Sequence, residues 1–438
     1  MINTKRRNLK MKFNEFPQAV VNENVDWTVR EITNVIKRYG PRESGNSNCL
    51  AAQKHIKKEM DTFCDETGFE GYKMNPKAFL HFTKTVSVAT ILAVVVCLLL
   101  TYLDVFDNIG KTAFFLPQII VGAVVIISLL IAFIQLTLYK PFCDIFYPKK
   151  DANNFYAKRA PKGEVKKRII ISGHIDAAYE CRHTRYSTKK IHLMFPLMAA
   201  TIGTLAISAV IAIISVIANF VNLGAFGDFM LDWSFHFHLL TAVAIIPLLF
   251  YVDFKTVAPG ANDNLTGTYA AVCALRMLDM AGVELENTEV VALINDGEEA
   301  GLKGIKAWAK SHKDEYVNSG VETYALCVDT LADDGYLKVF GKDMNSRVKN
   351  DAFFTNFVLE AGKETGADEM KIGSVFKGSS DAAAFSQAGI KATTLAAMDP
   401  APAYYYHNSR DNYDILNPEV IKKGYNVVIA TILNLDNK

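Results

Sequence analysis

Residues 293–304 read Leu293-Ile294-Asn295-Asp296-Gly297-Glu298-Glu299-Ala300-Gly301-Leu302-Lys303-Gly304. An apolar run ends in acidic residues, and the glycines that follow let the backbone turn sharply. The pattern predicts a buried strand over 289–295 and a helix over 301–312. Because adjacent side chains point in different directions, one carboxylate can bind a metal while the other addresses a water molecule. Acidic residues that offset the dipole of a helix explain the same pattern more simply.

On both sides of this stretch, short apolar runs alternate with helical periodicity. Two more strands are predicted over 168–172 and 324–330. The predicted helices cover 28–39, 50–67, 266–280, 301–312, 348–365 and 418–435, with a turn at 40–45. This alternation predicts an α/β fold with a helix-covered, mostly parallel sheet, whose ligands lie where the strands end.

Four long apolar runs interrupt the α/β pattern, at 86–103, 113–138, 193–221 and 235–252. Their lengths predict four membrane-spanning helices. The last run is the weakest, because it contains His236, His238 and Pro247 and would fit a buried core helix by itself. Asp, Glu, Lys and Arg are absent from all four runs, which argues against a transporter, since intramembrane charges commonly line a substrate path.

The charges that flank the apolar runs predict their orientation. Between the second and third runs the sequence contains thirteen Lys and Arg against five acidic residues. The loop between the first two runs holds Asp104, Asp107 and Lys111, and the charged residues between the last two are Asp228 and Asp232. Basic loops remain on the cytoplasmic side of a membrane. We therefore expect the stretch between the second and third runs, and with it the α/β part of the chain, to lie in the cytoplasm.

Composition excludes several classes of protein. Half of the 438 residues are hydrophobic and 21% are charged, which is unlike a disordered chain. Lys and Arg (47) nearly balance Asp and Glu (46), which argues against binding to nucleic acid through net charge. The seven cysteines have no short repeated spacing, so no disulfide framework is expected. Residues 5–12 are basic, but no apolar stretch follows them, so no cleaved signal is expected.

Further metal-binding side chains follow the predicted strands or precede the predicted helices. Gly173-His174-Ile175-Asp176 places an imidazole and a carboxylate on one face of a strand end, which suits a metal ligand and its orienting partner. Each residue alone also fits a solvated strand end, a turn or a cap. The joint set offers two imidazoles and three carboxylates: His174, Asp263, Glu299, Asp329 and His407. Such donors suit two divalent ions, with zinc the usual choice and manganese or cobalt as alternatives.

These stretches, in this order, resemble the M28 family of metallopeptidases, which includes aminopeptidases with two zinc ions bridged by an aspartate. The resemblance extends to the Gly40-Pro41-Arg42 turn and the Tyr406-His407 pair. It implies that His174 and Asp329 bind one zinc, that Glu299 and His407 bind the other, and that Asp263 binds both.

The resemblance also implies roles for residues that do not bind metal. Glu298 would be the general base, Asp176 would orient His174, and Tyr406 would hydrogen-bond the developing oxyanion. Asp381, in Gly378-Ser379-Ser380-Asp381-Ala382, matches a further family position, but Ala382 replaces the His that often follows. The role of Asp381 therefore stays open.

The chain departs from soluble relatives by its insertions. His174 and Asp263 are 89 positions apart, with two apolar runs between them. Because both ligands must lie on one side of the membrane, the chain has to cross it an even number of times. We therefore expect one discontinuous peptidase domain, a three-layer sandwich of the zinc aminopeptidase type. Its predicted parts are 1–85, 139–190 and 253–438, with transmembrane hairpins at 86–138 and 191–252.

The expected function is that of a membrane-anchored zinc exopeptidase, first an aminopeptidase, whose partners are a peptide substrate and the lipid bilayer rather than nucleic acid. A carboxypeptidase remains open, and the sequence predicts no oligomeric state. Two alternatives also remain: a single-zinc enzyme resembling the glutaminyl cyclotransferases, and a catalytically inactive membrane scaffold.

Overall fold

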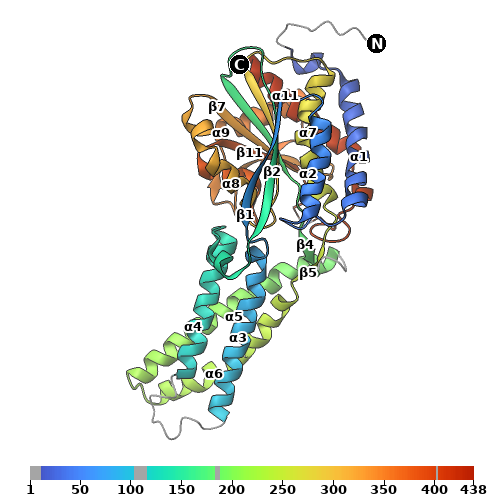
Figure 1. The fold of residues 1–438 in the computed structure, drawn as a ribbon. Helices are drawn as coiled ribbons and strands as arrows, with labels where there is room; N and C mark the ends of the chain where they lie inside the picture. Colours follow the sequence, from blue (N-terminus) through green and yellow to red (C-terminus); the bar gives the residue numbers. More distant parts are fainter. Residues whose placement is uncertain (1–10, 103–115, 183–187, 401–402) are drawn as a thin grey trace. The chain divides into compact units, whose positions relative to one another are not determined.

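The computed structural model describes residues 11–102, 116–182, 188–400 and 403–438, which form two compact units (Figure 1). The first unit comprises residues Met1–Pro76, Pro148–Glu180 and Lys255–Lys438, and the second comprises Lys77–Tyr147 and Cys181–Phe254. The basic residues 5–10 and the loop with Asp104, Asp107 and Lys111 lie outside the described residues.

A mixed sheet forms the middle of the first unit, with the strand order β1-β2-β6-β3-β7-β11-β8-β10 and a short β9 beside β8. The strands are β1 (Glu66–Met74), β2 (Lys150–Arg159), β3 (Lys167–His174), β6 (Thr288–Asn295), β7 (Glu322–Leu331), β8 (Leu337–Asp343), β9 (Val348–Lys349), β10 (Lys371–Ser374) and β11 (Lys391–Ala397). The four central strands, β6, β3, β7 and β11, are parallel, so their carboxyl ends meet at one edge. Antiparallel strands β2 and β8 flank them.

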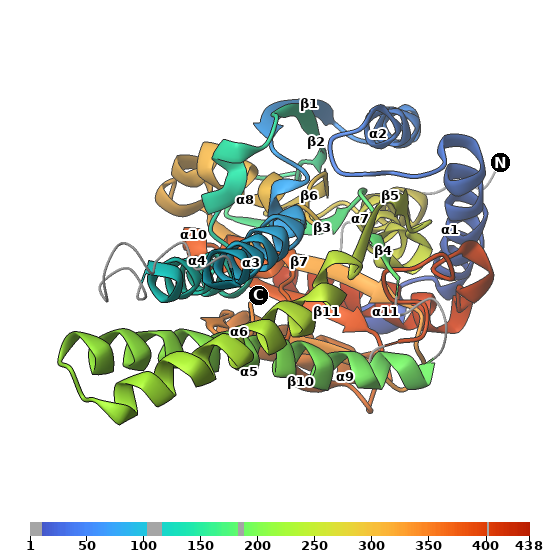
Figure 2. The ribbon, with the colours of Figure 1, turned by 90° about the horizontal axis from the view of Figure 1, so that it is seen from below.

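Helices cover both faces of this sheet (Figure 2). One layer contains α1 (Gln18–Tyr39), α2 (Ser47–Met60), α7 (Gly267–Met280), α9 (Ala352–Glu364) and α11 (Pro418–Asn437). The other contains α8 (Lys303–Ser311) and α10 (Asp381–Ala388). The main core lies between the sheet and the first layer, where Ile171, Leu326 and Tyr425 are fully buried. This arrangement confirms the predicted helix-covered α/β sandwich.

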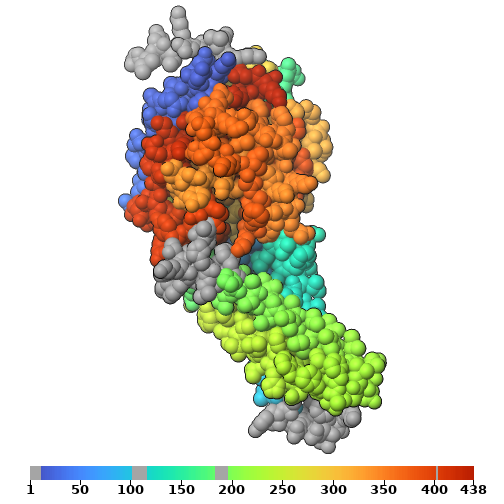
Figure 3. All heavy atoms as spheres, turned by 180° about the vertical axis from the view of Figure 1, so that it is seen from behind, coloured from blue at the N-terminus to red at the C-terminus, as the bar shows by residue number. Residues whose placement is uncertain are grey.

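The C-terminal third of the chain contributes much of the surface of the first unit. In the space-filling view these residues, coloured orange to red, cover most of the visible face of that unit (Figure 3).

The described chain also contains short helical turns: η1 (Phe13–Glu15), η3 (Phe133–Thr137), η4 (Phe142–Phe146), η5 (Ala261–Thr266), η6 (Asp314–Asn318) and η7 (Tyr413–Ile415).

Three predicted helix boundaries were wrong. The helix predicted over 50–67 ends at Met60, because the chain from Glu66 onward pairs with β2 as β1. The helix predicted over 348–365 begins at Ala352, where the side chain of Asp351 caps it by accepting a hydrogen bond from the backbone N–H of Phe354. The first helix begins ten residues before its predicted start, at Gln18, because its apolar face extends back to Val21.

The second unit is a group of four helices that contact one another: α3 (Ala78–Tyr102), α4 (Leu116–Ala132), α5 (Thr188–Phe220) and α6 (Ala225–Leu249). Within the described ranges, four helices are long and apolar enough to cross a membrane. Among these four, α6 has the lowest mean hydropathy, 1.5. Large apolar side chains such as Leu92, Ile127 and Val243 point outward, and each is more than half exposed. Exposed apolar faces of this extent are typical of helices that contact lipid.

Three polar side chains inside this unit form a hydrogen-bonded cluster. His238 of α6 is buried, and its two ring nitrogens lie 2.6 Å from Ser208 Oγ of α5 and 2.8 Å from Gln118 Oε1 of α4. The imidazole in the weakest apolar run therefore joins three helices. Strands β4 (Tyr179–Cys181) and β5 (Val252–Val257) pair in a separate two-stranded sheet.

Candidate metal centre

The five candidate ligands lie on strand ends and loops of the first unit. His174 ends β3, Asp329 lies near the end of β7, and Glu299 follows β6. Asp263 lies in η5, just before α7, and His407 lies in the loop before η7. The parallel strands explain why the first three meet at one edge of the sheet.

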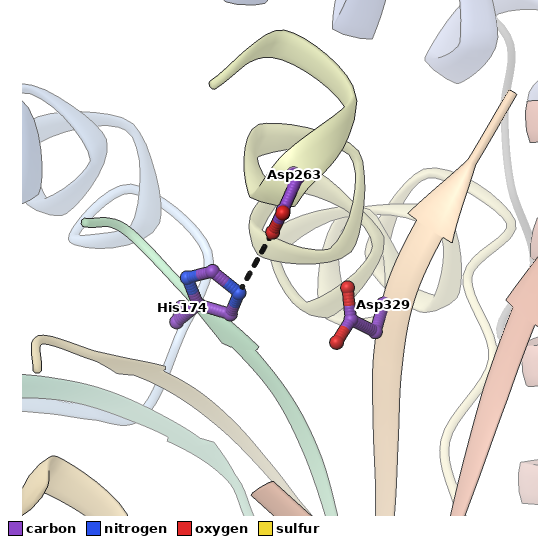
Figure 4. A group of neighbouring side chains, drawn as sticks. All are labelled: His174, Asp263 and Asp329. Atoms are coloured by element: carbon purple, nitrogen blue, oxygen red, sulfur yellow. Dashed lines mark ion pairs between the residues drawn. The ribbon is translucent and has the colours of Figure 1, made fainter. Parts of the chain in front are cut away.

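Among the described residues, these side chains form two groups that could hold a metal ion. The first is His174, Asp263 and Asp329, and the second is Asp263, Glu299 and His407. Within each group all ligand atoms lie within 4.8 Å of one another. Figure 4 shows the first group, in which the imidazole and both carboxylates point toward a common centre. Asp263 is common to both groups, as a bridging ligand must be.

The distances suit zinc. His174 Nε2 lies 3.3 Å from Asp263 Oδ1, while His407 Nε2 lies 3.2 Å from Asp263 Oδ2 and 3.4 Å from Glu299 Oε1. Two ligand atoms at ~2.0–2.1 Å from a tetrahedral zinc ion are separated by about 3.3 Å. Buried His174 Nε2 also has no hydrogen-bond partner among the described residues. A buried polar atom without a partner calls for an explanation, which a metal ion would provide.

Asp411 and Asn264, which were not among the predicted site residues, hold the Asp263 loop in place. Asp411 accepts hydrogen bonds from the backbone N–H groups of Asn262 (2.7 Å) and Asp263 (3.1 Å). Asn264 donates to the main-chain oxygen of Val328 (2.9 Å) and accepts from the N–H of Thr330 (3.2 Å). It thus joins the Asp263 loop to the strand end that carries Asp329. The partners of both residues are distant in the chain, so the sequence alone did not indicate these contacts.

Three residues at or near the candidate ligands have a positive φ. Thr330, which follows Asp329, has φ +55°, His407 has φ +50°, and Leu302, at the start of α8, has φ +62°. Residues other than glycine rarely adopt this left-handed conformation, and a β-branched residue such as Thr330 does so least readily. Such strain persists where surrounding contacts enforce it, and it is common at functional sites.

Glu298 lies beside the first group, with Oε2 3.9 Å from His174 Nε2. Its backbone N–H donates to Asp176 Oδ1 (3.2 Å), and the N–H of Glu299 donates to Asp176 Oδ2 (3.1 Å). His174 Nδ1 lies 3.0 Å from the main-chain oxygen of Asp176 and 3.5 Å from its carboxylate. Asp176 therefore contacts His174 and, through its carboxylate, also holds the turn that carries Glu298 and Glu299.

Tyr406 and Asp381 are the two remaining residues that the sequence indicated, and both lie outside the two ligand groups found in the described residues. The ring of Tyr406 stacks on His407, with ring centroids 3.8 Å apart. Its neighbour Tyr405 is buried and donates through its hydroxyl to Asp333 Oδ2 (2.9 Å). Asp381 is buried and accepts from Asn295 Nδ2 at 2.8 Å, and it belongs to neither ligand group found in the described chain.

Burial dominates the electrostatics of the carboxylates in the metal-free protein. It raises the pKa of Glu299 to about 8 and that of Asp329 to about 7, and the charge of Asp263 adds to both shifts. Burial also raises the pKa of Glu298 well above its ordinary value. For Asp263, burial is outweighed by the nearby imidazoles of His174 and His407, which lower the pKa. Glu299 and Asp329 therefore bind protons at a higher pH than ordinary carboxyl groups do.

We predict that zinc affinity rises between pH 6 and pH 8. A raised carboxyl pKa means that Glu299 and Asp329 are protonated at the lower pH, and a carboxylate must lose its proton to bind metal. The expected slope is about tenfold in apparent affinity per pH unit for each proton released. Competition with a chromophoric chelator measures it, and an affinity that does not change over this range would contradict the assignment.

The chain is similar to known proteins in sequence and in fold. Residues 251–432 match the sequence model of peptidase family M28. Among similar solved structures is the LapA aminopeptidase of Legionella pneumophila, with a TM-score of 0.53, 12% identity, and coverage of 100% of this chain and 78% of that chain. A glutaminyl cyclase of Fimbriiglobus ruber has a TM-score of 0.52 and 14% identity over 93% of this chain and 94% of its own. BSAP, a zinc aminopeptidase from Bacillus subtilis, has a TM-score of 0.50 and 13% identity, with coverage of 94% of this chain and 95% of that chain.

At these identities the solved structures show the fold, while the family match covers four of the five candidate ligands. Residues 251–432 thus match the sequence model of peptidase family M28, and the chain shares its fold with zinc aminopeptidases and glutaminyl cyclases.

Proposed function

We propose that this protein is a membrane-anchored exopeptidase with two zinc ions, which removes N-terminal residues from peptides. The observation that carries the proposal is the pair of ligand groups that share Asp263, with the carboxylate of Glu298 beside them. One carboxylate that offers one oxygen to each group is the arrangement that a dinuclear centre needs.

In this proposal His174 and Asp329 hold one ion, Glu299 and His407 hold the other, and Asp263 holds both. Bound zinc would supply an activated water and polarise the scissile carbonyl. Glu298 takes the proton of the water and later delivers it to the departing amine. Its raised pKa, which is caused by burial, suits a group that has to keep a proton between the two steps. Tyr406 would hydrogen-bond the developing oxyanion.

A panel of peptides tests the reaction. We expect two zinc ions per chain by elemental analysis, hydrolysis of peptides with a free N-terminus, and little hydrolysis of the same peptides after N-acetylation. A chelator should abolish the activity, and added zinc should restore it. Equal cleavage of free and acetylated peptides would rule out an aminopeptidase, and removal of C-terminal residues would indicate a carboxypeptidase.

A cyclising enzyme is the second candidate, because the fold is shared with glutaminyl cyclases. Such an enzyme would convert an N-terminal Gln to pyroglutamate and needs one zinc ion. Both ligand groups are complete in this chain, which favours hydrolysis. Pyroglutamate formation by a protein with one zinc ion per chain would reverse the order of the two candidates.

We further propose that the four apolar helices anchor the protein and that the catalytic unit faces the cytoplasm. The support is the excess of Lys and Arg in the stretch between the second and third apolar runs. A tag on the C-terminus should then be protected from protease in intact cells and cleaved after permeabilisation. Cleavage of the tag in intact cells would place the catalytic unit outside.

A further inference from the structure

The turn formed by residues 40–45, between α1 and α2, contacts every loop that carries His174, Asp263 or Glu298. This turn supplies no candidate ligand, and its residues lie more than a hundred positions before those loops in the chain. Its contacts are made by the side chains of Arg42 and Ser44 and by the backbone of Arg42 and Gly45. Their arrangement suggests a function beyond packing.

Ser44 reaches the general base through Asp176. The hydroxyl of Ser44 donates to Asp176 Oδ2 at 2.6 Å. The same carboxylate accepts from the backbone N–H groups of Glu298 and Glu299, at 3.2 and 3.1 Å. Ser44 and Asp176 are both buried. A buried carboxylate depends on its hydrogen-bond donors, and with three of them it has one orientation in which all are satisfied.

Gly45 holds the beginning of the same turn. Its backbone N–H lies 3.1 Å from both carboxylate oxygens of Asp296, which stands two residues before Glu298. Gly45 has φ +70°, and a Cβ atom at this position would meet Met74 Cε at 2.9 Å. The left-handed backbone conformation at this position therefore suits glycine.

Arg42 joins the other two loops. Its Nε donates to the main-chain oxygen of Ile175 and its Nη2 to that of Gly260, both at 2.9 Å. The main-chain oxygen of Arg42 accepts from the N–H of Ala177 at 2.9 Å. Ile175 follows His174, and Gly260 stands three residues before Asp263. The guanidinium thus fixes the distance between the loops that carry these two ligands.

We infer that residues 40–45 position the catalytic machinery and that Ser44 is the positioning residue for the general base. Ser44 orients Asp176, and Asp176 holds the amides of Glu298 and Glu299 and thereby the direction in which the Glu298 carboxylate points. This inference rests on the proposed function. Because a displacement of ~1 Å can cost on the order of 100-fold in rate, the loss of one hydroxyl should be visible in catalysis.

Ser44→Ala in the full-length protein tests the inference. We expect kcat to fall by about 10- to 100-fold, as is typical when a residue behind the catalytic groups is removed, with KM changed less than threefold. Zinc content should stay at the wild-type value, because Ser44 contacts none of the candidate ligand side chains directly. Ser44→Thr keeps the hydroxyl and should recover most of the rate.

Thr431→Val is the matched control. Thr431 is fully buried in α11, and its hydroxyl donates to the main-chain oxygen of Val427 at 2.7 Å. The substitution removes one buried hydroxyl hydrogen bond away from the metal centre, so it should leave kcat within about twofold of wild type. If the melting temperature of Ser44→Ala is well below that of this control, Ser44→Cys is measured instead. A thiol is similar in size to a hydroxyl but is a weaker hydrogen-bond donor.

Hydrogen exchange gives a readout that does not depend on the substrate. The amides of Glu298 and Glu299 should exchange faster in Ser44→Ala than in wild type and in Thr431→Val, with or without zinc. If the wild type hydrolyses no peptide but this exchange is faster, the proposed function fails and the positioning role stands. If the wild type is active and neither kcat nor these amides change in Ser44→Ala, the positioning role is overturned.

Discussion

Glu298→Gln is expected to lower kcat by about 10²- to 10⁴-fold while the protein keeps the zinc content of the wild type. The amide of Gln has nearly the shape of the carboxylate but neither accepts the proton of the water nor delivers one to the leaving amine. Glu298 belongs to neither of the ligand groups found in the described residues, so metal binding should survive. Steady-state kinetics on a free-amine peptide, together with elemental analysis, measures both effects.

Glu360→Gln is the control for this substitution. Glu360 lies on α9, its side chain is 68% exposed, and its ionic partner is the neighbouring Lys363. An exposed pair of this kind contributes little to stability, so this variant should behave as wild type. Normal turnover by Glu298→Gln would exclude Glu298 as the base, and loss of zinc in that variant would make it a ligand instead.

Asp263→Ala is expected to remove most of the zinc and to reduce activity to background. Its two oxygens lie 3.3 Å from His174 Nε2 and 3.2 Å from His407 Nε2, so one substitution removes a ligand from both groups. Asp329→Ala, by contrast, removes a ligand from the first group alone and should leave close to one zinc ion per chain. The comparison of the two stoichiometries tests whether Asp263 is shared.

Asp151→Ala serves as the control for the loss of an aspartate. The Asp151 side chain is 82% exposed, and it pairs with Lys73 at 2.7 Å on the surface of the first unit. Zinc content and activity should therefore stay at the wild-type values. Equal zinc loss in Asp263→Ala and Asp329→Ala would contradict two groups that share one carboxylate.

Three of the four central strands, β3, β6 and β7, were predicted from the sequence, whereas β11 and the strands outside the central four were not. Residues 289–295 form an apolar run because β6 is covered on both faces, and the structure places the strand at Thr288–Asn295. The β2 stretch Lys150–Arg159 contains charged and polar residues, and only part of it is buried. Its pairing with β6 and β1 makes it a strand, so its identity depends on neighbours distant in the chain.

The helix boundary at Met60 shows the same competition. Helical periodicity continued past this residue, but pairing of Glu66 with Lys158 begins β1 nearby. A local pattern is a weak preference, and tertiary hydrogen bonds decide between helix and strand when the two conflict.

The candidate spans and the types of metal-binding side chain could be predicted without coordinates. Both depend on residues that are contiguous, such as the apolar run 193–221, or on the chemistry of single residues, such as the imidazole of His407. Only the tertiary structure decided that Asp263 is common to two ligand groups and that Ser44, 132 positions before Asp176 in the chain, donates to its carboxylate. The physical reason is that a hydrogen bond or a shared ligand requires atoms about 3 Å apart, and the packing of distant segments sets that distance.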